Sequence, residues 1–269
     1  MVSKNKKMYE SCFSMNALQR VLIEKAGHDN GWEVVLAGSA DSVTLGSSQH
    51  DGSVRVVRHA DNNAFLCLFP DQIARSELTS AFPALVQPDG SFRAISAGDG
   101  LSRLLLRAAQ LQRSLPSAPE KEYAKQVAEA LAVDPNAMGT EVEAIIKRRV
   151  GQNVFRKALM DYWGGQCAVT GVSIPEVLRA SHCKPWADCR SDAERLDVYN
   201  GLLLTANLDA LFDKGLITFT DQGGIIISET LPATALPNLG VCKSLTLRRI
   251  STLHQPYLAY HREYVFYKD

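Results

Sequence analysis

The sequence has no excess charge of either sign and no long apolar run. Its 269 residues include 29 basic and 29 acidic side chains, so the formal net charge is zero. Overall electrostatics therefore do not indicate a nucleic-acid partner, and any basic surface has to be local. No stretch approaches the roughly 20 apolar residues that a membrane-spanning helix needs. We therefore expect no membrane partner.

The sequence also has no paired-cysteine motif. None of its six cysteines forms a C-x-x-C pair, which excludes a zinc ribbon. A chain of this length does not need disulfides for stability. The first residues, MVSKNKKMYESC, are basic but lead into no apolar segment of the kind found in a secretory signal. We expect reduced thiols and a cytoplasmic location.

The N-terminal part is rich in predicted strands. Four short runs have strand character and are separated by turn-forming residues: WEVVLAG (32–38), SVTLG (42–46), GSVRVVRH (52–59) and NAFLCLF (63–69). They predict an antiparallel meander, and good helix formers over 98–115 predict a helix after it. We therefore expect an α+β fold, with a strand-rich N-terminal α+β domain over residues 1–115 that recognises DNA or senses a signal.

A second domain is predicted after a connector. Residues 116–139 contain prolines and glycines around a charged, Ala-rich segment, which indicates a linker over 116–139 and a C-terminal domain over 140–269. Apolar residues on one helical face predict a helix after Thr140, which Gly151 interrupts. Between 144 and 160 this segment carries five basic residues and no acidic one. A solvated helix face and a phosphate-binding surface both explain that pattern.

The chemistry-bearing stretch is RASHCKPWADC, residues 179–189. CAVTG (167–171) and LRASHCKPW (178–186) read as strand segments. GLLLT (201–205) predicts another strand, followed by a helix that begins near Ala206. Helical spacing places Asp209 and Asp213 on one face of that helix.

Taken together, CAVTG, RASHCKPW, NGLLL and LFDKGLI resemble the HNH endonuclease family, in particular a restriction-endonuclease-like group within it. The resemblance covers only the C-terminal half and implies a ββα-metal nuclease domain there. It implies that His182 is the general base and that Asn200 braces the loop carrying it. Asp209 would hold a divalent metal, Mg²⁺ or Mn²⁺. The zinc-binding cysteines of many HNH domains are absent from the sequence, so no structural zinc is expected.

The sequence departs from the wider family at two positions. Ser181 stands where most members carry Asp or His, and Asp209 stands where most carry His. A serine hydroxyl is a poor ligand, so Ser181 is a weaker candidate for the metal. Asp213 is also a weaker candidate, because an acidic residue near a helix end has a structural explanation. A site with a single carboxylate would favour Mn²⁺, or would bind metal only together with DNA.

Seven residues are candidates for contact with DNA: Lys147, Arg148, Arg149, Gln152, Arg156, Arg179 and Lys184. The charged ones are also explained as solvated surface residues. For Gln152 and Arg156, a role in bracing the fold is an equally good explanation.

These patterns predict a metal-dependent endonuclease that hydrolyses phosphodiester bonds in double-stranded DNA. We expect a restriction or defence enzyme whose N-terminal domain reads the target, including modified bases. One alternative is an effector nuclease switched on by a ligand or partner that the N-terminal domain senses. Another is a DNA-binding module without catalysis. A homodimer is expected, because one HNH site nicks one strand.

Overall fold

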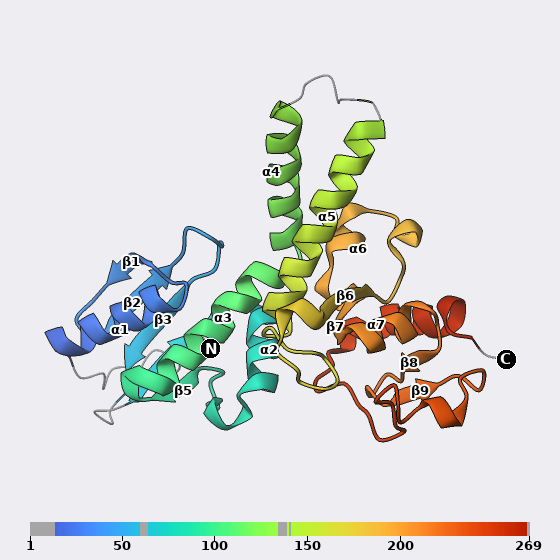
Figure 1. Cartoon of the computed structure of the whole chain (residues 1–269). Coiled ribbons are helices and arrows are strands. Elements are labelled where there is room, and N and C mark those ends of the chain that lie inside the picture. The colour runs from blue at the N-terminus through green and yellow to red at the C-terminus, as the bar shows by residue number, and fades with distance from the viewer. Residues whose placement is uncertain (1–13, 60–63, 134–138, 140, 268–269) are drawn as a thin grey trace, which may run out of the picture. The chain divides into compact units, whose positions relative to one another are not determined.

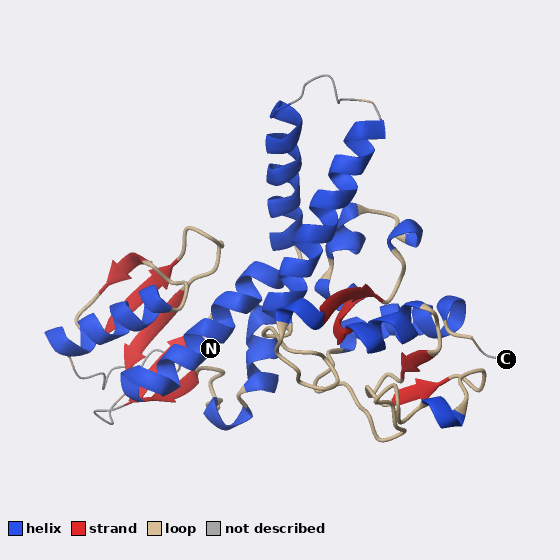
Figure 2. Ribbon diagram, viewed as in Figure 1, coloured by secondary structure: helices blue, strands red, loops and turns tan. Residues whose placement is uncertain are grey.

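The chain forms two compact units, separated between Arg113 and Ser114 (Figure 1). The computed structural model describes residues 14–59, 64–133, 139 and 141–267. The predicted domain start at Thr140, residues 134–138 of the predicted linker and residues 1–13 lie outside this part of the chain. The fold is mixed α and β, as the sequence predicts, with an N-terminal sheet followed by a second unit of helices and short strands (Figure 2).

The first unit is built on a five-stranded antiparallel sheet in which every strand pairs with its neighbour in sequence. The predicted meander is therefore present, with an additional strand beyond it. The strands are β1 (Val34–Gly38), β2 (Ser42–Gly46), β3 (Val54–Arg58), β4 (Ala64–Leu68) and β5 (Phe92–Ile95).

Three helices accompany this sheet: α1 (Ala17–Asp29), α2 (Gln72–Ala81) and α3 (Leu101–Ser114). The helix α3 corresponds to the predicted helix over 98–115, and its apolar side chains are buried except that of Leu106. The Trp32 indole N–H donates to the Leu105 carbonyl at 2.8 Å, which joins the segment after α1 to α3. The sequence pattern before residue 32 predicts only turns and short alternating runs, so α1 is an element that it misses.

The second unit begins with two long helices that lie side by side, α4 (Ala118–Val133) and α5 (Glu141–Tyr162) (Figure 1). Most of the predicted linker thus forms α4, which packs on α5 within the second unit. The helix α5 runs through Gly151 without a break, which corrects the predicted interruption. Gly151 is needed there because the Trp186 ring occupies the space that a Cβ atom would fill.

A β-hairpin and a helix follow and position the site. The strands β6 (Leu178–His182) and β7 (Gly201–Thr205) pair antiparallel, with His182 opposite Gly201. The chain then enters α7 (Ala206–Asp213), which packs on both strands. These elements confirm the predicted ββα order. Residues 167–171, expected as a strand, form a turn instead, because the Cys167 carbonyl accepts the N–H of Gly171, which has a positive φ.

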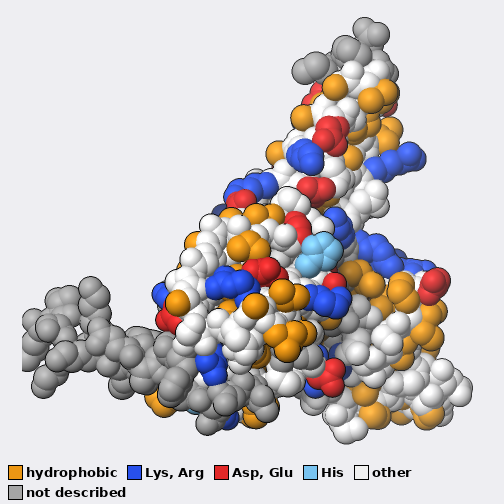
Figure 3. All heavy atoms as spheres, turned by 90° about the vertical axis from the view of Figure 1, so that its left-hand side faces the viewer, with side chains coloured by type: hydrophobic (Ala, Val, Ile, Leu, Met, Phe, Trp, Pro, Cys, Tyr) orange, Lys and Arg blue, Asp and Glu red, His pale blue; other side chains and the backbone are white. Residues whose placement is uncertain are grey.

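Shorter elements complete the second unit: α6 (Asp192–Leu196), β8 (Ile217–Phe219), β9 (Ile225–Ile227) and α8 (Gln255–Tyr260). Basic and acidic side chains are interspersed on the face that Figure 3 shows, in keeping with the zero net charge. Within the described residues, no helix is both long and apolar enough to cross a membrane.

Candidate active site

His182 is the last residue of β6, and its ring is held on three sides. Its Nε2 lies 2.9 Å from the Arg195 carbonyl oxygen. The ring stacks on Phe155 of α5, with centroids 3.8 Å apart and an interplanar angle of 14°. The Trp186 ring meets it edge-on at 5.8 Å. The imidazole is therefore fixed in position and orientation.

These contacts determine which ring nitrogen of His182 can accept a proton. A carbonyl oxygen only accepts hydrogen bonds, so the contact with Arg195 assigns the hydrogen to Nε2. Nδ1 then carries a lone pair and has no hydrogen-bond partner among the described residues. Burial lowers the pKa of His182 to about 4, although the bond to the Arg195 carbonyl acts in the opposite direction. The imidazole is therefore neutral at pH 7, as a general base must be.

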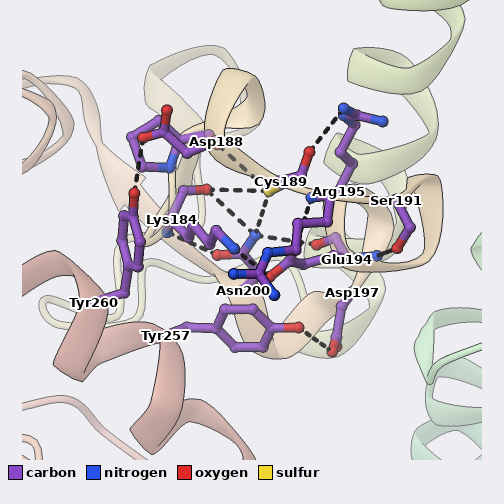
Figure 4. Close-up of polar contacts among 12 residues, drawn as sticks. Lys184, Asp188, Cys189, Ser191, Glu194, Arg195, Asp197, Asn200, Tyr257 and Tyr260 are labelled. Atoms are coloured by element: carbon purple, nitrogen blue, oxygen red, sulfur yellow. Dashed lines mark hydrogen bonds and ion pairs between the residues drawn. The ribbon is translucent and has the colours of Figure 1, made fainter.

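Asn200 ties together the two ends of the loop that joins β6 to β7 (Figure 4). Its side-chain oxygen accepts the Lys184 N–H at 2.8 Å, and its amide donates to the Glu194 carbonyl at 3.0 Å. Its backbone carbonyl accepts the Cys183 N–H at 2.9 Å. Asn200 is fully buried. These bonds connect Asn200 directly to the residues that follow His182.

Two further groups support the same loop, and of these residues only Lys184 was singled out in the sequence, for contact with DNA. Lys184 and Glu194 form an ion pair of 2.6 Å with both side chains largely buried. On α8, the Tyr257 hydroxyl donates to Asp197 at 3.0 Å, and the Tyr260 hydroxyl donates to Asp188 at 3.1 Å (Figure 4). Periodicity and local spacing give no signal for such contacts, because the partners of α8 lie 60 and 72 positions away.

Ser181 and Asp209 meet on the side of β6 that faces α7. The buried Ser181 hydroxyl donates to the Asp209 carboxylate at 2.6 Å. Neighbouring residues of a strand point to opposite faces, so Ser181 faces α7 while His182 faces α5. The end of β6 therefore carries the imidazole on one side and, on the other, the Ser181 hydroxyl that binds the Asp209 carboxylate of α7.

Asp213 lies one helical turn after Asp209, and the negative charge of Asp209 acts on the Asp213 carboxyl group. Partial desolvation of the carboxyl group, followed by the negative charge of Asp209, raises the pKa of Asp213 to about 6. Two carboxylates that repel each other and a nearby hydroxyl form a set of hard oxygen donors, which suits Mg²⁺ or Mn²⁺. The described residues contain no group of three or more His, Cys, Asp or Glu side chains arranged to hold a metal. The donor set thus fits a divalent ion that would keep several waters.

Four of the predicted DNA-contacting residues already have partners within the chain. Lys147 pairs with Glu143 at 2.6 Å. The Arg156 guanidinium donates to the Leu178 carbonyl at 2.6 Å and to the Pro175 carbonyl at 2.8 Å. For Arg156 this geometry favours the bracing role over the DNA-facing one.

Arg179 and Lys184 are the other two. Arg179 donates to the carbonyls of Glu176 and Leu178 but remains exposed. The Lys184 side chain is 11% exposed and its charge is neutralised by Glu194. In this position Lys184 supports the loop through its ion pair with Glu194, and its contact with DNA stays a prediction.

The remaining candidates, Arg148, Arg149 and Gln152, are exposed on α5. Lys157 is exposed on the same helix, two turns after Arg149. These four side chains have no hydrogen-bond or ion-pair partner within the described ranges. Arg148, Arg149 and Gln152 lie within about a third of the circumference of the helix whose Phe155 supports His182.

The cysteines near the site are buried. Cys167 and Cys183 are fully enclosed by the protein, as expected for packing residues. Burial raises the pKa of the Cys183 thiol well above its usual range, so this thiol stays protonated.

Comparison with known proteins supports the same segment. Residues 167–220 match the family described as HNH endonuclease, and this range contains β6, the loop, β7 and α7. No curated protein matches the chain.

Proposed function

We propose that this chain, whose residues 167–220 carry an HNH endonuclease domain, hydrolyses phosphodiester bonds in double-stranded DNA with His182 as the general base. A nuclease domain of this family implies a hydrolase that acts on DNA. The observation that carries the specific role is the contact of Nε2 with the Arg195 carbonyl, which leaves Nδ1 of a neutral imidazole as proton acceptor.

The chain's own residues supply most of the proposed mechanism. His182 takes the proton of the attacking water at Nδ1, while Asn200 keeps the loop that carries it in place. Asp209 would hold a divalent ion, with Ser181 and Asp213 close enough to contribute. HNH nucleases generally use such an ion, which when bound stabilises negative charge on the phosphate and on the leaving oxygen.

The exposed residues of α5 support a role in holding the DNA backbone. Arg148, Arg149 and Gln152 lie on the helix that contacts His182 through Phe155. A phosphate bound along this surface would lie near the end of β6. Such contacts position the duplex but carry no sequence information.

Cleavage of supercoiled plasmid tests the proposal. The protein is incubated with Mg²⁺, with Mn²⁺ or with EDTA, using plasmid from methylating and non-methylating hosts. We expect nicked or linear product with metal only, and loss of it in Asp209→Asn. Asn207→Ala, on the exposed side of the same helix, is the control and keeps full activity. Cleavage in EDTA, or unchanged cleavage by Asp209→Asn, would contradict the proposal.

A second candidate is a DNA-binding module without catalysis, and Ser181 favours it. The Ser181 hydroxyl adds a poor ligand at this position and already occupies one oxygen of Asp209. This reading predicts duplex binding that is insensitive to EDTA, with no scission on any substrate. A binding titration run beside the plasmid assay separates the two candidates.

We further propose that the enzyme is of the restriction or defence type, that its first unit reads the target and that it acts as a homodimer. The division into two compact units supports separate reading and cutting. Discrete fragments from plasmid cleavage would support a reading unit, whereas a smear would favour an effector nuclease. Light scattering at micromolar concentration tests the dimer, and a monomer that cuts both strands in one encounter would exclude it.

A further inference from the structure

Arg195 contributes both its backbone and its side chain to the loop after β6. Its carbonyl accepts the Nε2 hydrogen of His182 at 2.9 Å. Its guanidinium donates to the Cys189 carbonyl at 2.8 Å and to the Trp186 carbonyl at 3.3 Å. The same group pairs with Asp192 at 2.9 Å. One residue thus connects the imidazole to the middle of the loop.

The guanidinium also lies over the ring that packs against His182. It is 5.6 Å from the centroid of Trp186, and Trp186 meets the imidazole edge-on. Close packing of the half-buried Trp186 ring against Gly151 fixes this ring relative to α5. The side chain of Arg195 therefore sets the place of its own carbonyl by binding the segment that carries the Trp186 ring.

The position of this carbonyl matters for the state of the imidazole. The carbonyl stabilises the tautomer with hydrogen on Nε2, and that tautomer leaves Nδ1 able to accept a proton. If the carbonyl moved away, the tautomer with hydrogen on Nδ1 would become populated. In that tautomer Nδ1 is a donor and cannot take a proton from water.

We propose that Arg195 is a positioning residue whose side chain fixes the Nε2–H tautomer of His182. This inference rests on the proposed function, in which Nδ1 of His182 is the base. It assigns Arg195 a task distinct from that of Asn200, which bonds Lys184, Glu194 and the Cys189 thiol, whereas the Arg195 guanidinium bonds the Trp186 carbonyl and lies over the Trp186 ring.

The test reads the tautomer directly. Protein labelled with ¹⁵N in histidine is studied by long-range ¹H–¹⁵N NMR, and the His182 signals are assigned with His182→Gln. Wild type is compared with Arg195→Ala and Arg195→Lys. The matched control is Arg262→Ala. Arg262 also donates to a carbonyl at 2.8 Å, that of Phe219, and pairs with an aspartate, Asp221, at similar exposure.

We expect His182 in wild type and in Arg262→Ala to have its hydrogen on Nε2. Arg195→Ala should populate both tautomers, and Arg195→Lys, which retains one donor site, should fall between. Should Arg195→Ala fail to fold, Arg195→Lys decides. An unchanged tautomer in the folded Arg195 variants would overturn the inference, as would an equal change in Arg262→Ala.

Cleavage kinetics give a second readout. Arg195→Ala should lower kcat by about 10- to 100-fold, the range found for groups that orient an active-site ligand, with little change in KM. Arg262→Ala should leave both constants near wild type. If wild type cleaves no DNA, the proposed function fails, and the NMR measurement still decides the role of Arg195.

Discussion

At the scale of single residues, the loop between β6 and β7 depends on buried polar groups that are all satisfied. Asn200 uses both ends of its amide, and Lys184 and Glu194 neutralise each other. Removing one member leaves buried donors or acceptors without partners, which costs more than the bond itself contributes. The residues around His182 are therefore expected to be sensitive to conservative changes.

Asn200→Ala tests this sensitivity. The change leaves the Lys184 N–H and the Glu194 carbonyl without their partner, so we expect a loss of about 1–3 kcal/mol in the free energy of unfolding. Urea denaturation measures it. Asn207→Ala is the control, since its one bond to the Leu239 carbonyl is exposed, and it should change stability by about 0.5 kcal/mol or less. Equal effects of the two substitutions would contradict the role described for Asn200 in holding the loop.

The buried histidine His261 makes stability depend on pH. Burial lowers its pKa to about 4, against the bond to the Phe212 carbonyl, while the ordinary value is 6.5. As pH falls below 6.5, His261 becomes protonated in the unfolded chain, whereas in the folded chain it stays neutral until about pH 4. The free energy of unfolding therefore decreases between these two pH values. At pH 5 the loss is on the order of 2 kcal/mol for this one group.

His261→Gln should remove that part of the pH dependence. Urea denaturation at pH 7 and at pH 5 gives the two free energies of unfolding, and their difference should be smaller in the variant. An identical difference in the two proteins would show that His261 does not stay neutral in the fold.

At the scale of elements, the helix α5 and the loop after β6 pack closely because residue 151 of the helix is a glycine. A Gly→Ala change inside a helix ordinarily stabilises by about 1 kcal/mol. At Gly151 the new methyl group would overlap the Trp186 ring, and overpacking of this kind costs about 1–3 kcal/mol. Helix propensity therefore predicts that Gly151→Ala stabilises the chain, whereas packing against Trp186 predicts that it destabilises the chain.

We expect Gly151→Ala to destabilise the chain and to slow cleavage by displacing the ring beside His182. In a Trp186→Ala background the same change should stabilise, because the obstacle is gone. Thermal or urea unfolding of the four proteins in this cycle measures the coupling. Stabilisation of the wild-type background by Gly151→Ala would contradict the packing described for α5.

The same elements show what the sequence can and cannot predict. Strands β2 to β4, the order β6–β7–α7 and the burial of Leu208 on α7 follow from alternation and helical spacing. The helix α1 was missed because its Leu18 and Leu22 are exposed and blur the periodicity. Its start was nevertheless marked, since Asn16 and Gln19 form a capping box.

The site is partly predictable for the same physical reason. Ser181 and Asp209 are brought together by the strand and the helix of the predicted ββα motif. Arg195 acts on His182 through a backbone carbonyl, which no side-chain pattern reveals, and the roles of Phe155 and α8 depend on tertiary contacts outside that motif. The glycine at 151 makes room for the Trp186 ring without breaking α5, so the break predicted from the glycine alone was wrong.

At the scale of the whole molecule, a neutral chain needs a local basic surface to hold DNA. We expect the pair of substitutions Arg148→Glu and Arg149→Glu to weaken duplex binding by about 10-fold or more. The slope of log affinity against log salt should fall by about 2, because two phosphate contacts are lost. Fluorescence anisotropy in EDTA measures both quantities without cleavage.

The control is the pair Lys121→Glu and Lys125→Glu, which reverses the charge of two exposed lysines on the neighbouring helix α4. It changes the net charge by the same amount and should leave the slope near that of wild type. If both double variants lose affinity equally, net charge determines binding and α5 is not the contact surface.

The central claim is that Nδ1 of His182 acts as the base, and single-turnover cleavage by His182→Ala tests it most directly. We predict a rate at least about 100-fold below wild type, the contribution typical of general base catalysis. Added imidazole should restore part of the rate in the variant and none in Asp209→Asn. Cleavage by His182→Ala at the wild-type rate would contradict the account.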